Sequence, residues 1–246
     1  RVDKVNSINA GKFPFENVDK KLQQAMEICV KNGNLRADTA TKWFEEADIV
    51  LSDINLDVNY KQSGEPYLDL TMYKNAIHII GSKIKPETLV IVETTVPPGT
   101  CEKVVKPILQ EEFQKRGIEN EEILLAHSYE RVMPGVNYYD SIVNYWRVYS
   151  GINEKSAEKC AEFMCNVINV KDYPLTKLGC TTASETAKVL ENSYRAVTIA
   201  FMEEWGRFAE KADFDLFEVV DAIKMRPTHS NMRQPGFGVG GYCLTK

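Results

Sequence analysis

Short apolar runs rich in β-branched residues alternate with stretches of helical periodicity over the first 175 residues, and this alternation limits the fold most narrowly. Residues 88–93 read Thr-Leu-Val-Ile-Val-Glu, which is typical of a buried strand in a parallel sheet. Helical spacing of apolar residues precedes it at 70–84 and follows it at 101–116. We therefore predict an α/β domain with a parallel sheet. Further strands are expected at 47–52, 123–126 and 146–151, and further helices at 19–32 and 154–167.

The pattern changes after residue 175, where one long helix is expected over 182–212. Its apolar residues recur at steps of three and four: Ala187, Leu190, Tyr194, Val197, Phe201, Trp205 and Phe208. A helix of this length measures about 45 Å and is longer than a small domain is wide. We expect it to form the spine of a second, helical domain or a subunit interface. A shorter helix is expected at 217–224.

Composition excludes several classes of partner. The net charge is -5 and the basic residues are dispersed, which argues against nucleic acid as a partner. No apolar run approaches the roughly 18 residues of a membrane span, and the first residues lack the apolar core of a signal peptide, so we expect a cytoplasmic protein with no membrane association. The six cysteines form no CxxC pair and there are three histidines, so neither a metal site nor a disulfide framework is expected.

A glycine-rich loop stands directly before one cysteine near the end of the sequence. Gly236, Gly238, Gly240 and Gly241 permit positive φ angles and close approach of main-chain amides to a phosphate or sugar, and Cys243 follows them. The spacing also fits a dinucleotide fingerprint, but the preceding residues do not read as a strand and no helix pattern follows. We therefore interpret the loop as one that carries a nucleophile. The alternative is an ordinary loop with an incidental thiol.

Polar residues occur in three further places where chemistry is expected. Residues 93–100 and 128–135 each follow an apolar strand, at the carboxyl end where open α/β sheets bind ligands. On the long helix, Glu185, Lys188 and Asn192 share one face. This face is either solvated, with a weak Glu-Lys pair, or it holds a cation and an amide over a reacting oxygen.

Taken in this order, the motifs resemble those of the UDP-glucose/GDP-mannose dehydrogenase family. The family's Ser/Thr-Thr-x-Pro-x-Gly strand end falls on residues 94–99, its Lys-x-x-x-Asn helix on Lys188 and Asn192, and its Gly-Gly-x-Cys loop on residues 240–243. Ser-Tyr-Glu-Arg-Val at 128–132 is similar to the form found in members that oxidise N-acetylhexosamine nucleotides. Members that use UDP-glucose usually carry a second glutamate where this sequence has Pro134.

The resemblance implies a domain organisation. Residues 1–175 would form the NAD-binding, Rossmann-like domain without its first strand and glycine fingerprint. Residues 176–246 would form the central helical domain, which serves dimerisation and substrate binding and ends in the cysteine loop. The family's C-terminal UDP-binding domain is not in the sequence, which resembles part of a longer protein.

The resemblance also implies an activity, the NAD-dependent four-electron oxidation of the C6 alcohol of a nucleotide-sugar to a uronate. The substrate would be a UDP-N-acetylhexosamine, and the product would serve polysaccharide biosynthesis. Cys243 would be the nucleophile that forms a thiohemiacetal and then a thioester. Lys188 and Asn192 would stabilise oxyanions. Glu130 would be the general base, and Thr95 would position the attacking water.

Binding roles follow from the same resemblance. Arg131, Gly238, Gly240 and Gly241 would contact the nucleotide-sugar. Thr95 and Glu130 would also face the NAD cofactor, and Lys246 would approach the cofactor phosphates. A homodimer through the long helix is expected.

Two other classes of function remain open. The 6-phosphogluconate and β-hydroxyacid dehydrogenases also carry a lysine and an asparagine four apart on a long helix, but their reaction removes two electrons and leaves Cys243 without a role. The second alternative is a non-catalytic, dimerising fragment that binds a nucleotide-sugar.

Overall fold

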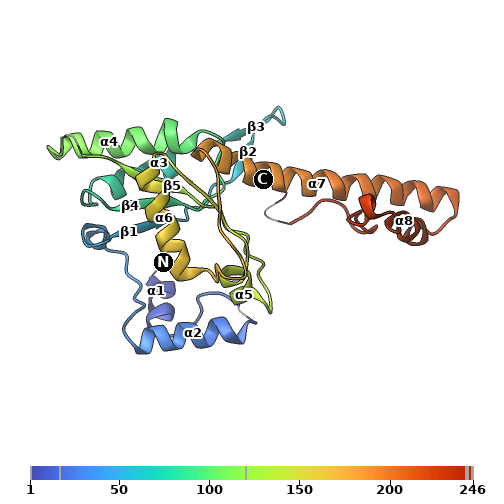
Figure 1. Ribbon diagram of the computed structural model, residues 1–246, viewed down its shortest axis with the longest axis horizontal. Helices are drawn as coiled ribbons and strands as arrows, with labels where there is room; N and C mark the ends of the chain where they lie inside the picture. Colours follow the sequence, from blue (N-terminus) through green and yellow to red (C-terminus); the bar gives the residue numbers. More distant parts are fainter. Residues whose placement is uncertain (1, 17, 120, 242–243, 245–246) are drawn as a thin grey trace. The chain divides into compact units, whose positions relative to one another are not determined.

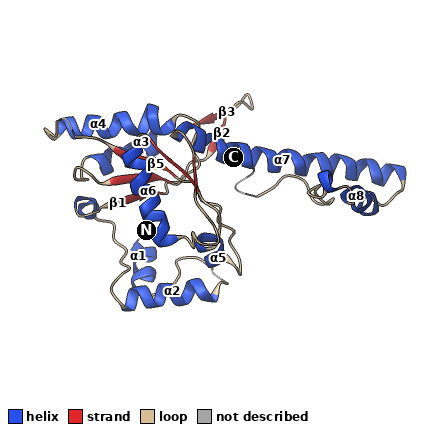
Figure 2. Cartoon of the chain, viewed as in Figure 1, coloured by secondary structure: helices blue, strands red, loops and turns tan. Residues whose placement is uncertain are grey.

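The computed structural model describes residues 2–16, 18–119, 121–241 and 244. The chain divides into two compact units (Figures 1 and 2). The first comprises Arg1–Leu56 and Leu68–Glu185, and the second comprises Asp57–Tyr67 and Thr186–Lys246. The division is based on contacts between residues in space. Each unit consists of two segments that are separated in the sequence.

A five-stranded sheet forms the centre of the first unit. Its strands are β1 (Ile49–Ser52), β4 (Leu89–Val92), β5 (Leu124–His127), β6 (Val148–Gly151) and β7 (Thr176–Lys177), in the order β1-β4-β5-β6-β7. All pairs are parallel except β5 with β6, which is antiparallel. Because β1, β4 and β5 are parallel and in register, their carboxyl ends meet at one edge.

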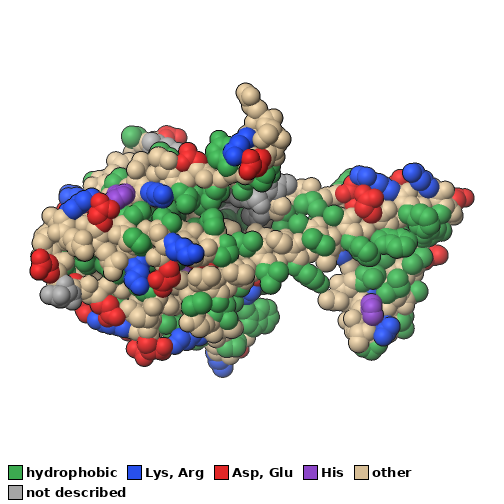
Figure 3. Space-filling view, turned by 90° about the horizontal axis from the view of Figure 1, so that it is seen from above, with side chains coloured by type: hydrophobic (Ala, Val, Ile, Leu, Met, Phe, Trp, Pro, Cys, Tyr) green, Lys and Arg blue, Asp and Glu red, His purple; other side chains and the backbone are tan. Residues whose placement is uncertain are grey.

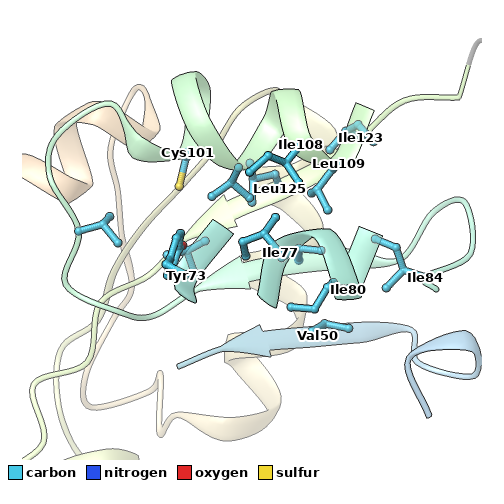
Figure 4. Packing of buried hydrophobic residues seen from close by; sticks show 14 of the residues in the cluster. Val50, Tyr73, Ile77, Ile80, Ile84, Cys101, Ile108, Leu109, Ile123 and Leu125 are labelled. Atoms are coloured by element: carbon cyan, nitrogen blue, oxygen red, sulfur yellow. The ribbon is translucent and has the colours of Figure 1, made fainter. Parts of the chain in front are cut away.

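Helices cover both faces of this sheet. Those of the first unit are α1 (Val2–Asn9), α2 (Lys20–Lys31), α3 (Thr71–Gly81), α4 (Lys106–Lys115), α5 (Tyr138–Val143) and α6 (Glu154–Val167), with a 3-10 turn at Thr41–Glu45 and a π-helical turn at Cys101–Val105 before α4. Val90 and Val92 point to the face covered by α3 and α4, whereas Leu89 and Ile91 point to the face covered by α6. Figure 4 shows Ile77 of α3 and Leu109 of α4 in the first of these cores. Every residue of β4 is buried, as expected for a strand between two helical layers.

The second unit is built on α7 (Thr181–Ala212), which begins in the first unit. It also contains α8 (Leu216–Lys224), a 3-10 turn at Pro227–His229 and the two-stranded sheet of β2 (Val58–Tyr60) and β3 (Pro66–Leu68). Its small core joins Met202 and Ala209 of α7 to Leu216 and Val220 of α8. Figure 3 shows hydrophobic side chains exposed on the surface of this part of the chain. None of the helices in the described ranges combines the length and apolar character that crossing a bilayer requires.

The prediction of an α/β protein with a parallel-dominated sheet and one long helix is confirmed. Two details differ from the expected pattern. β6 runs antiparallel to β5, and the small β2-β3 sheet belongs to the helical unit.

Candidate active site

The loop after β4 is fixed at its first end by Thr94. The Thr94 hydroxyl accepts a hydrogen bond from the Ile54 amide (2.8 Å) and lies 2.9 Å from the Ile54 carbonyl oxygen, which joins the ends of β4 and β1. Thr94 is buried with its hydroxyl engaged, whereas Thr95 is half-buried. The predicted site residue Thr95 is therefore the threonine that a ligand at this edge of the sheet could contact.

The second end of the same loop is held by Glu185. The Gly99 amide donates to Glu185 Oε2 at 2.5 Å and the Cys101 amide donates to Glu185 Oε1 at 2.8 Å. Gly99 has a φ of 91°, a conformation in which a side chain would be strained. Glu185 is fully buried, so a solvated polar face is the wrong interpretation for this residue.

The loop after β5 carries Glu130 and Arg131. The Glu130 carboxylate accepts a hydrogen bond from the Val132 amide, which closes a tight turn. Arg131 donates to the Tyr129 hydroxyl and to the Trp146 carbonyl oxygen, both at 3.0 Å, and its guanidinium lies over the Tyr129 ring. Because β4 and β5 are neighbouring parallel strands, Thr95 and Glu130 follow adjacent strand ends at one edge of the sheet.

The carboxylates of Glu93, Asp53 and Glu130 interact at this edge of the sheet. The sequence analysis did not identify Glu93 or Asp53 as site residues. Burial raises the pKa of Glu93; the charge of Arg147 opposes this shift, while the charges of Asp53 and Glu130 add to it. Arg147 Nη2 donates to Glu93 Oε1 at 3.2 Å in a largely buried pair. A glutamate directly after a fully apolar strand was the available signal for Glu93. The location of Arg147 before β6 carried no such signal.

A fully buried polar cluster anchors the first turn of α7 to the sheet. Ser184 Oγ lies 2.7 Å from His127 Nδ1 of β5 and 2.6 Å from Ser150 Oγ of β6. All three residues have no exposed surface. The serine-histidine pair resembles a catalytic arrangement only in its atoms, because no substrate could reach it without opening the core. We assign it to the stability of the fold.

The glycine-rich loop belongs to the second unit and packs against α7. A Cβ atom at Gly238 would lie 2.4 Å from Glu203 Oε2, so this glycine allows a close approach to Glu203. Gly241 has a φ of 82°, which also favours glycine, and the Gly238 carbonyl oxygen is the described atom that a Cβ at Gly240 would meet, at 4.0 Å. Cys243 and Lys246, the predicted nucleophile and phosphate contact, lie outside the described residues.

Lys188 and Asn192 also belong to the second unit. They lie four residues apart on α7 and therefore on the same face of the helix. The structure thus brings Thr95, Glu130 and Arg131 to one edge of the first unit, and it places Lys188, Asn192 and the three predicted substrate-binding glycines in the second.

The edge of the sheet that carries Thr95 has room for part of a cofactor. A cavity of about 480 Å³ opens in the first unit, and its lining includes Ser52, Asp53 and Ile54 at the end of β1 and Phe44 and Asp38 beside them. Open α/β sheets bind dinucleotides outside the carboxyl ends of their strands, so this position fits NAD. The described part of this unit has no glycine-rich turn after a strand. The described residues therefore leave room for NAD but include no glycine-rich turn that could hold its pyrophosphate. Among the described residues, no cluster of His, Cys, Asp and Glu has the geometry of a metal site.

Family models match nearly all of this fold. The NAD binding domain of the UDP-glucose/GDP-mannose dehydrogenase family matches residues 1–168, and the family's central domain matches residues 182–246. The α/β unit and the long helix thus match two successive domains of one enzyme family. The chain belongs to the UDP-glucose/GDP-mannose dehydrogenase family. This confirms the resemblance seen in the motifs and the expectation of NAD as the cofactor.

Relatives with similar sequences share one name. UDP-N-acetyl-D-mannosamine dehydrogenase of Methanocaldococcus jannaschii is 30% identical over 231 residues, which are 94% of this chain and 50% of that protein. The Campylobacter jejuni protein of the same name is 31% identical over 245 residues, 98% of this chain and 56% of its own length. The crystal structure of NDP-N-acetyl-D-galactosaminuronic acid dehydrogenase from Methanosarcina mazei Go1 superimposes with a TM-score of 0.80 at 28% identity, covering 99% of this chain and 50% of that one. The chain spans about half the length of the relatives it matches.

Proposed function

We propose that the protein oxidises the C6 primary alcohol of a UDP-N-acetylhexosamine to the carboxylate. The observation that carries this proposal is the placement of Thr95 and Glu130 on adjacent strand ends in a chain of this family. The Ser-Tyr-Glu-Arg-Val sequence around Glu130 and the names of the relatives support an N-acetylhexosamine as the sugar.

The reaction removes four electrons in two oxidations, and the protein must hold the aldehyde between them. NAD, when bound, supplies the hydride acceptor for each oxidation. In the proposal the Cys243 thiolate adds to the aldehyde carbon to form a thiohemiacetal, whose oxidation gives a thioester. Water then attacks the thioester carbonyl, and the carbon-sulfur bond breaks to release the carboxylate and regenerate the thiolate. Neighbouring positive charge and loop amides would favour the thiolate form of Cys243.

The remaining polar residues have electrostatic and proton-transfer roles in this proposal. The Lys188 ammonium and the Asn192 amide stabilise the negative charge that develops on the substrate oxygen. Glu130 removes a proton from the attacking water, which Thr95 helps to position. Both residues also face NAD.

Substrate and cofactor contacts complete the proposal. The glycines Gly238, Gly240 and Gly241 would let main-chain amides approach the nucleotide-sugar. Arg131, whose guanidinium donates to the Tyr129 hydroxyl and to the Trp146 carbonyl oxygen, would contact the nucleotide-sugar. Lys246 would contact the cofactor phosphates.

We also propose a homodimer in which a second copy covers the apolar stripe of α7. Tyr194, Val197, Phe201, Trp205 and Phe208 are each between 45% and 67% exposed, although a large apolar side chain usually gains stability from burial. Val197, Phe201, Trp205 and Phe208 line one groove. A contiguous apolar surface of this kind is typical of a protein interface.

The experiment that tests the function measures the NADH formed per molecule of sugar nucleotide consumed by the full-length protein. UDP-N-acetylmannosamine, UDP-N-acetylgalactosamine and UDP-N-acetylglucosamine should be compared. A ratio near two is expected with one epimer and identifies the sugar. A ratio near one would contradict the four-electron reaction and favour the two-electron dehydrogenase class. No turnover with any epimer would favour the non-catalytic alternative.

A further inference from the structure

Glu185 is a buried acid in the first unit that none of the proposed chemical steps uses. It lies in the first turns of α7, and both of its carboxylate oxygens accept hydrogen bonds from main-chain amides of residues 99 and 101. The other glutamates of α7 differ from it, because Glu191, Glu204 and Glu210 are exposed and Glu203 is half-buried.

Burial of the Glu185 carboxylate destabilises the fold unless the hydrogen bonds to this carboxylate are retained. An ionised carboxylate that is removed from water loses several kcal/mol of solvation, which only charge-assisted hydrogen bonds can offset. The two donors are main-chain amides at or just before the start of the π-helical turn Cys101–Val105, where the helix dipole also favours negative charge. The arrangement therefore fixes the position of both amides relative to α7.

The loop between β4 and this helix start is held at its two ends and by Val96, whose side chain is buried in the core. Pro97 and Pro98 have no amide hydrogen, and both are exposed. Thr94 fixes the first end of the loop at β1, and Glu185 fixes the second end at Gly99. Thr95 lies between Thr94 and the buried Val96, and the stiff proline pair connects Val96 to the second attachment at Gly99.

We propose that Glu185 is a positioning residue, which acts by holding the 95–99 backbone so that Thr95 keeps its place at the edge of the sheet. The inference rests on the proposed role of Thr95 in the attack of water on a thioester. It assigns to Glu185 no contact with substrate or cofactor. Loss of the Glu185 hydrogen bonds should therefore slow the hydrolytic step and leave substrate binding unchanged.

Glu185→Gln is the sharpest test, because it keeps the shape of the side chain and removes one acceptor. Its amide oxygen can accept from one of the two main-chain amides, while its NH₂ group faces the other. In the full-length protein, kcat should fall by up to about 10²-fold, the loss that a displacement near 1 Å can cause. The KM for the sugar nucleotide should stay within about twofold. Glu210→Gln, an exposed change on the same helix, is the matched control and should alter neither constant.

Pre-steady-state kinetics distinguishes positioning from simple destabilisation. If thioester hydrolysis becomes slow, Glu185→Gln should release about two NADH per active site in a burst before slow turnover. Thr95→Ala should show the same burst. The double variant should be no slower than Thr95→Ala alone, since both changes act on one group. Additive losses without a burst would overturn the inference.

One further measurement keeps the inference separable from the proposed function. Amide hydrogen exchange at Gly99 and Cys101 should be slow in the natural protein and much faster in Glu185→Gln, whatever the reaction is. Unchanged exchange would overturn the inference even if the enzyme forms two NADH per sugar. A protein that oxidises no sugar nucleotide would instead refute the proposed function. If Glu185→Gln does not fold, Glu185→Asp, which keeps the charge and can reach only one amide, carries the same test.

Discussion

The thiol of Cys160 lies in the core between α6 and the sheet, with no exposed surface. Burial raises its pKa from 9.0 to about 12. In the native protein this thiol stays protonated above pH 9, whereas in the unfolded chain it ionises. The unfolded state therefore binds fewer protons, and stability is lost as the pH rises from 9 to 12.

This difference gives a prediction for Cys160→Ala. Each pH unit in that range should cost the natural protein about 1.4 kcal/mol through Cys160, and the variant should lack this contribution. The free energy of unfolding should be measured by urea denaturation at pH 8 and pH 10.5. The natural protein should be more stable at pH 8 because the variant leaves a cavity, and this advantage should shrink by about 2 kcal/mol at pH 10.5. Parallel pH dependences would contradict the assignment.

Replacement by alanine should have opposite effects on stability at Gly99 and at Gly206. Gly99→Ala places a side chain at a φ of 91° and should cost about 1–2 kcal/mol of stability. Gly206→Ala lies within α7, where no described atom outside the local helix backbone and the adjacent residues is within 4 Å of the added methyl group, and should stabilise the protein by about 0.5–1 kcal/mol. Thermal unfolding of the two variants beside the natural protein checks both signs. Equal shifts in one direction would show that backbone conformation does not decide the outcome.

Cys243→Ser tests the covalent step of the proposed reaction. A serine hydroxyl is far less ionised than a thiol, so uronate formation should fall by at least about 10²-fold, the scale observed when one group that acts on a transition state is removed. Binding of the sugar nucleotide, measured by calorimetry, should be retained. Full turnover by the variant would remove the thioester from the mechanism.

At the scale of elements, the exposed apolar stripe of α7 is the reason why we propose a homodimer. Along one side of the helix, the Trp205 ring makes T-shaped contacts with the Phe201 and Phe208 rings, with centroids 6.3 and 5.6 Å apart. These contacts lie within one chain, and each of the three side chains still remains about half exposed. A second copy of the helix is the occupant that we propose for it.

A charge placed in the stripe should therefore separate the subunits. Phe201→Glu is expected to weaken dimerisation by at least about 2 kcal/mol, because an unpaired carboxylate would be buried at the interface. Met72→Glu, which adds the same charge to an exposed position of α3 in the first unit, is the control. Sedimentation equilibrium over a range of concentrations measures both. A natural protein that stays monomeric at micromolar concentration would refute the dimer.

The sequence pattern locates long elements well and short ones poorly. Periodicity places α6 at 154–167 and α7 at 182–212, and the observed helices are Glu154–Val167 and Thr181–Ala212. The strands β2, β3 and β7 have two or three residues each, too few for an alternating pattern to stand out. The direction of β6 also had no signal, because strand direction depends on the path of the connection rather than on side chains.

The candidate site shows the same limit. The segments that contain Thr95 and Glu130 could be predicted because each follows an apolar strand, whereas the choice of these two residues rested on the resemblance to the family. Glu185 could not be understood in this way, since its partner Gly99 is 86 residues away. A contact of that separation has no local pattern, and helical spacing alone left a solvated face and a functional face as alternatives.

At the scale of the whole molecule, the two units interrupt each other along the chain. Asp57–Tyr67 lies inside the sequence of the first unit and is counted with Thr186–Lys246. During synthesis this short segment leaves the ribosome long before its partners do. At roughly 5–20 residues per second, on the order of ten seconds pass before residue 186 is made. The second unit can therefore be completed only after two separated pieces of nascent chain have come together.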